Sequence, residues 1–282
     1  MSTMGSALPR TGADASPAAG DRERHVYDYA FDLDGDAASA RVCRMVGRGK
    51  RVLEIGAGPG SITKVLKAQD NRVIALEVDE TAIPYLLPHC DKVVAADLNR
   101  ADWPTTLGDV RFDAIVIADV LEHLSDPWST VGRAKSLLAP GGALVVSLPH
   151  ASHACMVACL LGEDVHYGDW GLLDRTHIRF FGLHNMQAMF RDAGMKLVRA
   201  ELVVRTPAET ELHDQWKALP RATRRLLEKQ PFSHVYQVVL AAAPNEDPRP
   251  AVDLLSLDQR DFAAKTSLLG GAKRLLTRMR GR

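Results

Sequence analysis

The chain has 282 residues and a formal net charge of zero, because 35 basic side chains balance 35 acidic ones. This balance argues against a nucleic-acid-binding domain, which usually carries a basic excess. The hydrophobic fraction of 46% is ordinary for a globular protein, and four cysteines are too few for a disulfide scaffold. No apolar run approaches the ~18–20 residues that span a bilayer. We therefore expect a cytoplasmic protein.

The composition divides the chain into three parts. Residues 1–24 are rich in Ala, Gly, Ser and Pro and are predicted to be a disordered leader, because they offer little apolar surface to offset the entropy of ordering. Residues 25–244 are predicted to form the folded domain. Residues 245–282 form a tail with six basic and no acidic residues after Asp261. We expect this tail to be solvated and partly helical, with weak contact to an anionic membrane surface as the alternative.

Strands and helices are predicted to alternate through the first half of the domain. A helical pattern covers residues 25–46 and is interrupted near Gly35. Continuous apolar strands separated by helices then indicate a parallel sheet covered on both faces. The predicted strands are Arg51–Ile55, Arg72–Glu77, Lys92–Ala96, Ala114–Ala118 and Ala143–Leu148; the predicted helices are Ser61–Ala68, a broken helix at Thr81–Leu87, and Pro127–Leu138, followed by a turn at Pro140–Gly142.

The pattern changes after Pro149. Residues 151–182 show little periodicity and are dense in His, Asp, Trp and Phe, which predicts a lid or acceptor-binding region. Within it, Cys155 and Cys159 are expected to be small buried apolar residues rather than a redox pair. The remaining predicted elements are a helix at Leu183–Ala193, strands at Lys196–Arg205 and Ser233–Ala243, and a helical insertion at about residues 207–231 that is broken at Pro220.

The most informative stretch is Val52–Gly60, at the junction of the first predicted strand and the helix after it. Gly56, Gly58 and Gly60 alternate there. Glycine permits a tight turn and lets ligand atoms approach the backbone, while the start of the helix offers unpaired N–H groups. A dinucleotide fingerprint requires glycine where this chain has Ser61. The stretch therefore predicts a loop that binds a ligand other than NAD.

Two acidic residues lie at the ends of the next predicted strands. Glu77 ends the second strand, where a carboxylate can accept two ribose hydroxyls. Asp97 ends the third strand, a place suited to the exocyclic amine of adenine. An adenosine group without a pyrophosphate fits these positions better than a dinucleotide.

These motifs resemble those of the class I S-adenosylmethionine-dependent methyltransferases, and most of all the ubiquinone-biosynthesis-type and methyltransferase-domain subfamilies. The resemblance covers about residues 45–150. It implies an α/β fold with a Rossmann-like seven-stranded sheet, an antiparallel C-terminal strand pair and helices on both faces. The segments that carry it are Leu53–Gly60, Glu77, Asp97, Asp119–Leu124 and Leu138–Gly142.

The same resemblance implies S-adenosyl-L-methionine as cofactor. The Gly56–Gly60 loop would hold its methionine part, Glu77 its ribose, Asp97 with Leu98 its adenine, and Asp119 would lie near its ammonium group. Glu122 and His123 match the family pattern and are expected to shape the loop beside the cofactor. The full set of expected cofactor-binding residues is Glu54, Gly56, Ala57, Gly58, Gly60, Glu77, Val78, Asp97, Leu98, Asp119, Val120 and His123.

A second likeness lies in residues 168–181. This segment resembles part of bacterial methyltransferases that occur with glycosyltransferase and surface-polysaccharide genes. Those relatives usually carry Pro-Asn where this chain has Pro149 and His150, which adds an imidazole at the ligand-binding edge of the sheet. The likeness implies polysaccharide biosynthesis, with O-methylation of a sugar or glycan precursor.

Transfer of a methyl group to a hydroxyl requires an oriented acceptor and the removal of its proton. Imidazole suits the second task because its pKa, near 6.5, lies close to neutral pH. His177 is the favoured general base, with Asp174 to orient it and Arg179 to hold an anionic group of the acceptor; His150 is the second candidate. The alternative is that His177 and Arg179 only pin the lid to the domain.

The sequence disfavours some other functions and leaves others open. A metal site built from His166, Asp169, Asp174 and His177 is disfavoured because the spacing matches no standard ligand set, so we expect no metal. Methylation of a small secondary metabolite at O or N, and a catalytically silent cofactor-binding subunit, stay open. A nicotinamide-dependent oxidoreductase is disfavoured by Ser61. The expected partner is a small-molecule or saccharide acceptor, with no nucleic acid, and the oligomeric state is open.

Overall fold

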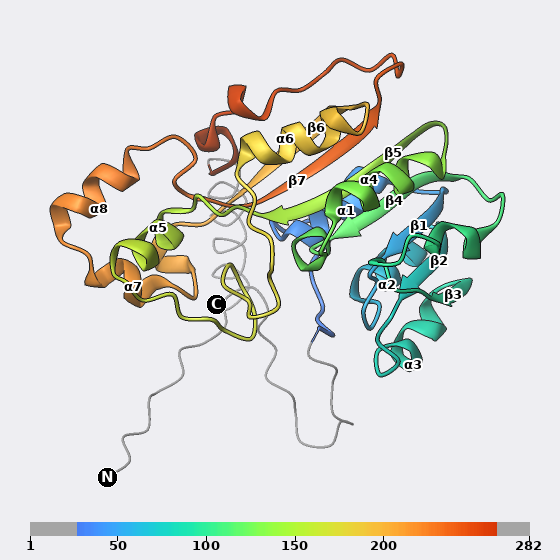
Figure 1. Cartoon of the computed structure of the whole chain (residues 1–282), viewed down its shortest axis with the longest axis horizontal. Helices are drawn as coiled ribbons and strands as arrows, with labels where there is room; N and C mark the ends of the chain where they lie inside the picture. Colours follow the sequence, from blue (N-terminus) through green and yellow to red (C-terminus); the bar gives the residue numbers. More distant parts are fainter. Residues whose placement is uncertain (1–26, 264–282) are drawn as a thin grey trace, which may run out of the picture.

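The computed structural model describes residues 27–263 and contains one seven-stranded sheet (Figure 1). The strand order is β3-β2-β1-β4-β5-β7-β6. The first five strands in this order run parallel, and β7 runs antiparallel to both β5 and β6. The strands are β1 (Arg51–Ile55), β2 (Arg72–Glu77), β3 (Lys92–Ala95), β4 (Phe112–Ala118), β5 (Leu138–Pro149), β6 (Met195–Val204) and β7 (Val235–Pro244).

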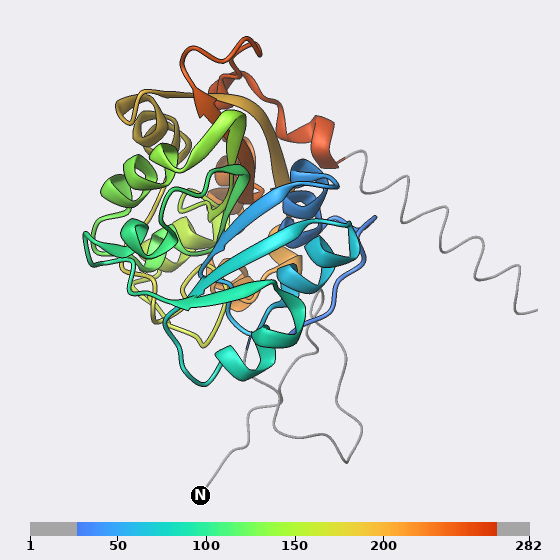
Figure 2. The ribbon, with the colours of Figure 1, turned by 90° about the vertical axis from the view of Figure 1, so that its right-hand side faces the viewer.

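Helices cover both faces of the sheet, as its view from the β3 edge shows (Figure 2). This confirms the predicted Rossmann-like fold with an antiparallel strand pair at the C-terminal end. The α-helices are α1 (Ala38–Val46), α2 (Ser61–Ala68), α3 (Ile83–Leu86), α4 (Pro127–Ser136), α5 (Ala154–Leu161), α6 (Leu183–Asp192), α7 (His213–Ala218) and α8 (Arg221–Glu228), and the short 3₁₀ turns include η3 (Leu121–His123) and η4 (Pro207–Glu209).

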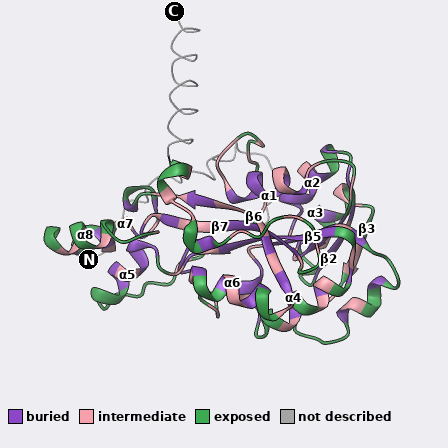
Figure 3. Ribbon diagram, turned by 90° about the horizontal axis from the view of Figure 1, so that it is seen from above, coloured by how far each residue is buried: buried purple, intermediate pink, exposed green. Residues whose placement is uncertain are grey.

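The two faces of the sheet bury alternate residues of each strand, as the pleat requires. On β1, Leu53 and Ile55 belong to the large core that also contains residues of α4 and α6. Val52 of the same strand belongs to a second core, with Val42 of α1 and Leu66 of α2. Figure 3 shows the buried sheet between more exposed helices. Because both faces are covered, the central strands are largely apolar, which is why the sequence predicted them well.

Three predictions about local structure were wrong. The helix expected from residue 25 begins only at Ala38, because Gly35 and Asp34 are held in a turn through Asp32. The turn expected at Pro140–Gly142 lies inside β5 as an irregular part of its pairing with β4. The region expected to be irregular contains α5, whose residues are apolar around most of its surface and so show no helical periodicity.

A small third core lies beyond the carboxyl end of β5, where α5 and α7 lie near one another in Figure 1. It joins Cys155 and Cys159 of α5 to Leu172 and Leu173 of the following loop and to Trp216 of α7. Both cysteines are buried and unpaired, as predicted. The helix α8 beside this core buries none of its residues. This core includes Leu172 and Leu173 and so anchors the start of the segment that leads to His177.

None of the helices in residues 27–263 is long and apolar enough to cross a membrane. The predicted disordered leader, and the predicted helical and membrane-contacting part of the tail from residue 264 onward, lie outside the described residues.

Candidate active site

The glycine loop between β1 and α2 takes a conformation that its glycines make possible. Gly56, Gly58 and Gly60 all have positive φ angles, of 67°, 54° and 91°, which other residues adopt only at a cost. Gly56 is also the most crowded, because a Cβ atom there would lie 2.6 Å from Cγ2 of Val120. Val120 belongs to the loop after β4. The glycine loop therefore lies directly against the end of the neighbouring strand.

Glu77 joins this loop to the end of β2. Its Oε2 accepts a hydrogen bond from the backbone N–H of Gly58 at 2.6 Å. Its Oε1 accepts hydrogen bonds from the N–H groups of Val78 and Asp79, both at 2.8 Å. The side chain of Val78 is 61% exposed beside it. A carboxylate fixed in this way can accept hydrogen bonds from the hydroxyls of a ribose. The apolar surface of Val78 next to it can pack against a flat ring attached to that ribose.

Glu54 lies beneath the loop and does not reach its surface. The residue is 3% exposed, and its Oε2 accepts a hydrogen bond from Oγ1 of Thr63 at 2.6 Å. Burial raises the pKa of Glu54 to about 8, and the charge of Glu77 adds to the shift. The structure therefore places Glu54 as a support of the loop from below.

The end of β3 and the turn after η3 are joined through Asn99. Asp97 accepts a hydrogen bond from the N–H of Asn99 at 2.9 Å. Oδ1 of Asn99 in turn accepts from the N–H and the hydroxyl of Ser125, at 3.1 and 2.6 Å. Leu98, between them, is buried at 9% exposure. The predicted adenine-binding pair thus lies at the same sheet edge as Glu77.

Asp119 follows β4 with a φ of 53°, an uncommon value for a residue other than glycine. Its Oδ1 accepts hydrogen bonds from Oγ of Ser147 and Nε2 of Gln237, both at 2.9 Å. Burial raises its pKa, and these two hydrogen bonds work against that shift. Such local strain is often found at functional sites. The carboxyl ends of β1, β2, β3 and β4 therefore all contribute to one site.

The N-terminal segment at Tyr27–Phe31, here called the strap, crosses the start of α2. The hydroxyl of Ser61 donates to the carbonyl of Tyr27 and accepts from the N–H of Tyr29, each at 3.0 Å. Asp28 forms an ion pair with Lys64 at 2.9 Å. Tyr27 is also hydrogen bonded to Thr176 of the lid region. Sequence reasoning missed the strap, because its partners lie far along the chain.

The lid region docks on η3 through its backbone. The N–H groups of Ile178 and Arg179 both donate to the carbonyl of Glu122, at 3.0 Å. The guanidinium group of Arg179 donates from Nη2 to the carbonyl of Ser125 at 2.6 Å. These contacts agree with the alternative in which Arg179 holds the lid. They also bring the segment with His177 against the loop after β4.

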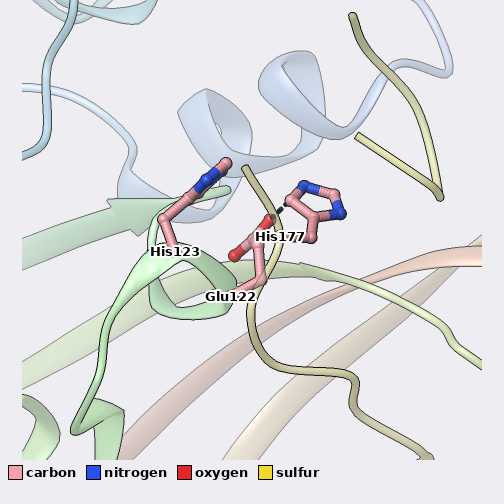
Figure 4. A group of neighbouring side chains, drawn as sticks. All are labelled: Glu122, His123 and His177. Atoms are coloured by element: carbon pink, nitrogen blue, oxygen red, sulfur yellow. Dashed lines mark ion pairs between the residues drawn. The ribbon is translucent and has the colours of Figure 1, made fainter. Parts of the chain in front are cut away.

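Glu122, His123 and His177 form a compact polar cluster between η3 and the lid (Figure 4). Nε2 of His177 lies 3.9 Å from Oε1 of Glu122, and the two imidazole rings are 4.8 Å apart. Burial lowers the pKa of His177, and the neighbouring His123 lowers it further. Burial raises the pKa of Glu122 well above its ordinary value, as does the charge of Asp119. Both shifts favour the uncharged forms of these two side chains.

The other candidate residues are placed elsewhere. His150 is 2% exposed, and its Nδ1 is hydrogen bonded to the carbonyl of Val235 at 3.1 Å, so its ring ties β5 to β7. Asp169 is paired with Arg175 on the surface, at 2.6 Å. Asp174 accepts from Thr176, and His166 is exposed. The disfavoured metal group of His166, Asp169, Asp174 and His177 is not assembled among the described residues.

Residues 31–200, more than half of the chain, match the family model described as a methyltransferase domain. The chain belongs to this methyltransferase domain family. Among curated relatives, it is 26% identical over 156 residues to the ubiquinone biosynthesis O-methyltransferase of Azoarcus sp. strain BH72, an alignment that covers 53% of this chain and 66% of that protein. It is 29% identical over 119 residues to the protein of the same name from Xylella fastidiosa strain 9a5c, covering 41% and 48%. The alignments thus span less than two thirds of these relatives.

Solved structures support the fold of this family member. An S-adenosylmethionine-dependent methyltransferase from Mesorhizobium loti superposes with a TM-score of 0.51 at 17% identity, covering 75% of this chain and 99% of that one. The magnesium protoporphyrin IX methyltransferase of Synechocystis PCC 6803 with bound SAH gives a TM-score of 0.50 at 15% identity, covering 73% and 83%. At these identities the likeness shows the shared fold alone.

Proposed function

We propose that the chain is an S-adenosyl-L-methionine-dependent methyltransferase that methylates an oxygen atom of a small acceptor. The observation that carries this proposal is the link from the Gly58 N–H to Glu77 at the carboxyl ends of β1 and β2. In open α/β sheets, ligands bind at this edge, where the strand order reverses. Here the reversal lies between β1 and β4.

The residues at this edge fit the cofactor. Glu77 would hold the ribose hydroxyls, Asp97 and Leu98 the adenine, and the glycine loop with Asp119 the amino-acid part. The exposed side chain of Val78 adds apolar surface beside the adenine position. When bound, the cofactor supplies a methyl group on a sulfonium sulfur, which is already activated for transfer. The chain itself must orient the acceptor and deal with its proton.

The acceptor would lie beside the lid region and the cluster of Glu122, His123 and His177. Nδ1 of His177 is hydrogen bonded to the carbonyl of Leu172 at 3.3 Å, which leaves the lone pair on Nε2 free to accept a proton or bind a cation. His150 stays a second candidate, although its Nδ1 is engaged with Val235. Arg179 would position the acceptor by holding the lid at Ser125.

For the acceptor class, we propose a sugar or glycan precursor. Support comes from the likeness of residues 168–181 to methyltransferases found with polysaccharide genes, and from exposed aromatic side chains in that region. Trp170 and Phe180 are 49% and 46% exposed, and flat apolar rings of this kind pack against the C–H face of a sugar. A phenolic hydroxyl is the second candidate, because the curated relatives from Azoarcus and Xylella are named for ubiquinone biosynthesis.

The test is methyl transfer from S-adenosylmethionine labelled in its methyl group, with the full chain and two acceptor pools. One pool holds nucleotide sugars and oligosaccharides, and the other holds catechols and phenols. We expect label in the sugar pool; label in the phenol pool alone would overturn the sugar proposal and keep the methyltransferase. His177→Ala should lower turnover about 10²- to 10⁴-fold and leave cofactor affinity nearly unchanged. No cofactor binding by the parent protein would overturn the function itself.

A further inference from the structure

Glu122 is a buried carboxylic group to which no other described residue donates a hydrogen bond. It is 1% exposed, and only the N–H group of Glu122 itself, among residues 27–263, faces its carboxyl group. Burying a polar group without partners from the surrounding structure is costly, and such groups are rare in folded proteins. The position therefore suits a positive charge that no hydrogen-bond donor of the described residues supplies.

The two imidazoles beside Glu122 are oriented by their second nitrogen atoms. Nδ1 of His177 is hydrogen bonded to the carbonyl of Leu172 at 3.3 Å. Nδ1 of His123 is hydrogen bonded to the carbonyl and the hydroxyl of Thr176, at 3.2 and 3.0 Å. Because a carbonyl only accepts, each Nδ1 carries the proton and each Nε2 keeps its lone pair. Metal-bound histidines usually have this arrangement, with one nitrogen on the metal and the other donating to a carbonyl.

We propose that Glu122, His123 and His177 form a binding site for a divalent first-row transition-metal ion. One donor atom from each residue lies within 4.8 Å of the others. Donor atoms around a tetrahedral ion are ~3.3 Å apart, given bond lengths of ~2.0–2.2 Å. Moving each donor atom by less than ~1 Å would therefore close the site. Two imidazoles with one carboxylate suit Zn²⁺, Co²⁺ or Mn²⁺ better than the oxygen ligands that Ca²⁺ and Mg²⁺ prefer.

A plain ion pair explains the cluster less well. His177 and Glu122 approach only to 3.9 Å and share no hydrogen bond. Pairing would also require His177 to be protonated next to the second imidazole of His123, whose ring lies 4.8 Å away. A bound cation instead uses both imidazoles in their neutral form. It also gives the orphaned carboxylate a partner.

The site has room for a further ligand, since three protein donors leave at least one coordination position open. If the proposed function holds, the acceptor hydroxyl would fill it. The ion would lower the pKa of that hydroxyl, whose proton would pass to water, and His177 would then act as a ligand of the ion in place of a general base. The oxygen would then form its bond to the methyl carbon as the carbon–sulfur bond breaks and its electron pair returns to sulfur. Metal binding itself does not depend on this step.

The experiment is titration of the chelator-treated, full-length protein with Co²⁺, followed by calorimetry and by the visible absorption of the ion. We expect one equivalent to bind, with absorption typical of a nitrogen- and oxygen-ligated site. Glu122→Gln and His177→Ala should each weaken the affinity at least ~100-fold, more than the loss typical of an outer-shell residue. His184→Ala removes an exposed imidazole from α6 and should change nothing.

Folding is checked by thermal unfolding without metal. Glu122→Gln should then be at least as stable as the parent, because it removes a buried group that prefers a cation. If His177→Ala unfolds, the folded Glu122→Gln variant still tests the metal site. The proposal is overturned if the parent binds no Co²⁺ at millimolar concentration, or if Glu122→Gln binds it as tightly as the parent. Cofactor binding is measured in the same samples. If the protein binds S-adenosylmethionine but not Co²⁺, only the metal-site proposal is overturned. If it binds Co²⁺ but not S-adenosylmethionine, only the proposed function is overturned.

Discussion

The backbone N–H of Gly58 donates to Oε2 of Glu77, and this side-chain hydrogen bond adds to the backbone hydrogen bonds from Gly56 and Ala57 to the carbonyl of Leu76, which also connect the glycine loop to the end of β2. Oε1 of the same carboxylate already accepts from Val78 and Asp79. An ionised carboxylate offers about four lone-pair sites, so one remains, on Oε2. In the proposed function, a ribose would use that site and share or replace the bond from Gly58. We therefore propose two tasks for Glu77, which are to shape the loop and to bind the sugar.

Substitution of Glu77 should separate these tasks. Glu77→Gln leaves one accepting oxygen for three backbone donors, and its amide group would face N–H groups. We expect it to lower the free energy of unfolding by about 1–3 kcal/mol and to weaken cofactor binding by more than ~10-fold. Chemical denaturation and calorimetry measure the two effects. Glu80→Gln, at an exposed position of the same turn, is the control. Parent-like affinity in Glu77→Gln would remove Glu77 from the ribose site.

The glycine loop allows a comparison of two alanine variants. Gly56→Ala and Gly58→Ala both place a side chain at positive φ, but only the first meets a neighbour, Val120, at 2.6 Å. We expect Gly56→Ala to cost about 1–3 kcal/mol more than Gly58→Ala, the usual cost of overpacking. Adding Val120→Ala should recover part of that difference in the first variant and none in the second. Denaturant unfolding of the two alanine variants, each with and without Val120→Ala, tests this. Equal losses of unfolding free energy in Gly56→Ala and Gly58→Ala would show that the strain of the positive φ alone sets the cost.

The strap makes a third prediction possible. Ser61→Ala removes the hydroxyl that bonds both Tyr27 and Tyr29, so we expect faster amide exchange in residues 27–31 and faster release of bound cofactor. Ser136→Ala, which removes a local hydrogen bond on α4, should leave both rates unchanged. Hydrogen exchange and stopped-flow release supply the readouts. Unchanged exchange in the strap would mean that the ion pair of Asp28 with Lys64 holds it instead.

The buried Glu54 should make stability depend on pH. Its pKa is raised from an ordinary value of 4.5 to about 8 in the folded protein, so between these values the unfolded chain is ionised while the folded one keeps its proton. The contribution of protonated Glu54 to the free energy of unfolding is fully present below pH ~4.5. It is lost as the pH rises toward 8, by up to about 1.4 kcal/mol per pH unit. Glu54→Gln should therefore gain stability relative to the parent from pH 5 to pH 8. Glu246→Gln, at an exposed position, should not; a gap that stays constant with pH would contradict the raised pKa.

Much of the fold was predictable because the central strands are buried on both faces and are rich in apolar residues, most clearly in the continuous apolar run Ala114–Ala118 of β4. The residues of the expected cofactor site could also be placed at one sheet edge from the sequence, since the glycines and strand-end acids are local signals. The contacts of the expected acceptor region could not. Glu122 and His123 gain their partner His177 only when the lid folds back, and no spacing in the sequence records that contact. The strap was missed for the same reason, because Ser61 meets Tyr29 across 32 residues.

The central claim is that the edge formed by Gly58, Glu77, Asp97 and Asp119 binds S-adenosyl-L-methionine. Equilibrium dialysis of the full chain with the labelled compound, with excess S-adenosylhomocysteine or NAD as competitor, tests it most directly. We expect saturable binding of one equivalent that S-adenosylhomocysteine displaces and NAD does not. Absence of saturable binding, or displacement by NAD at similar concentration, would contradict it.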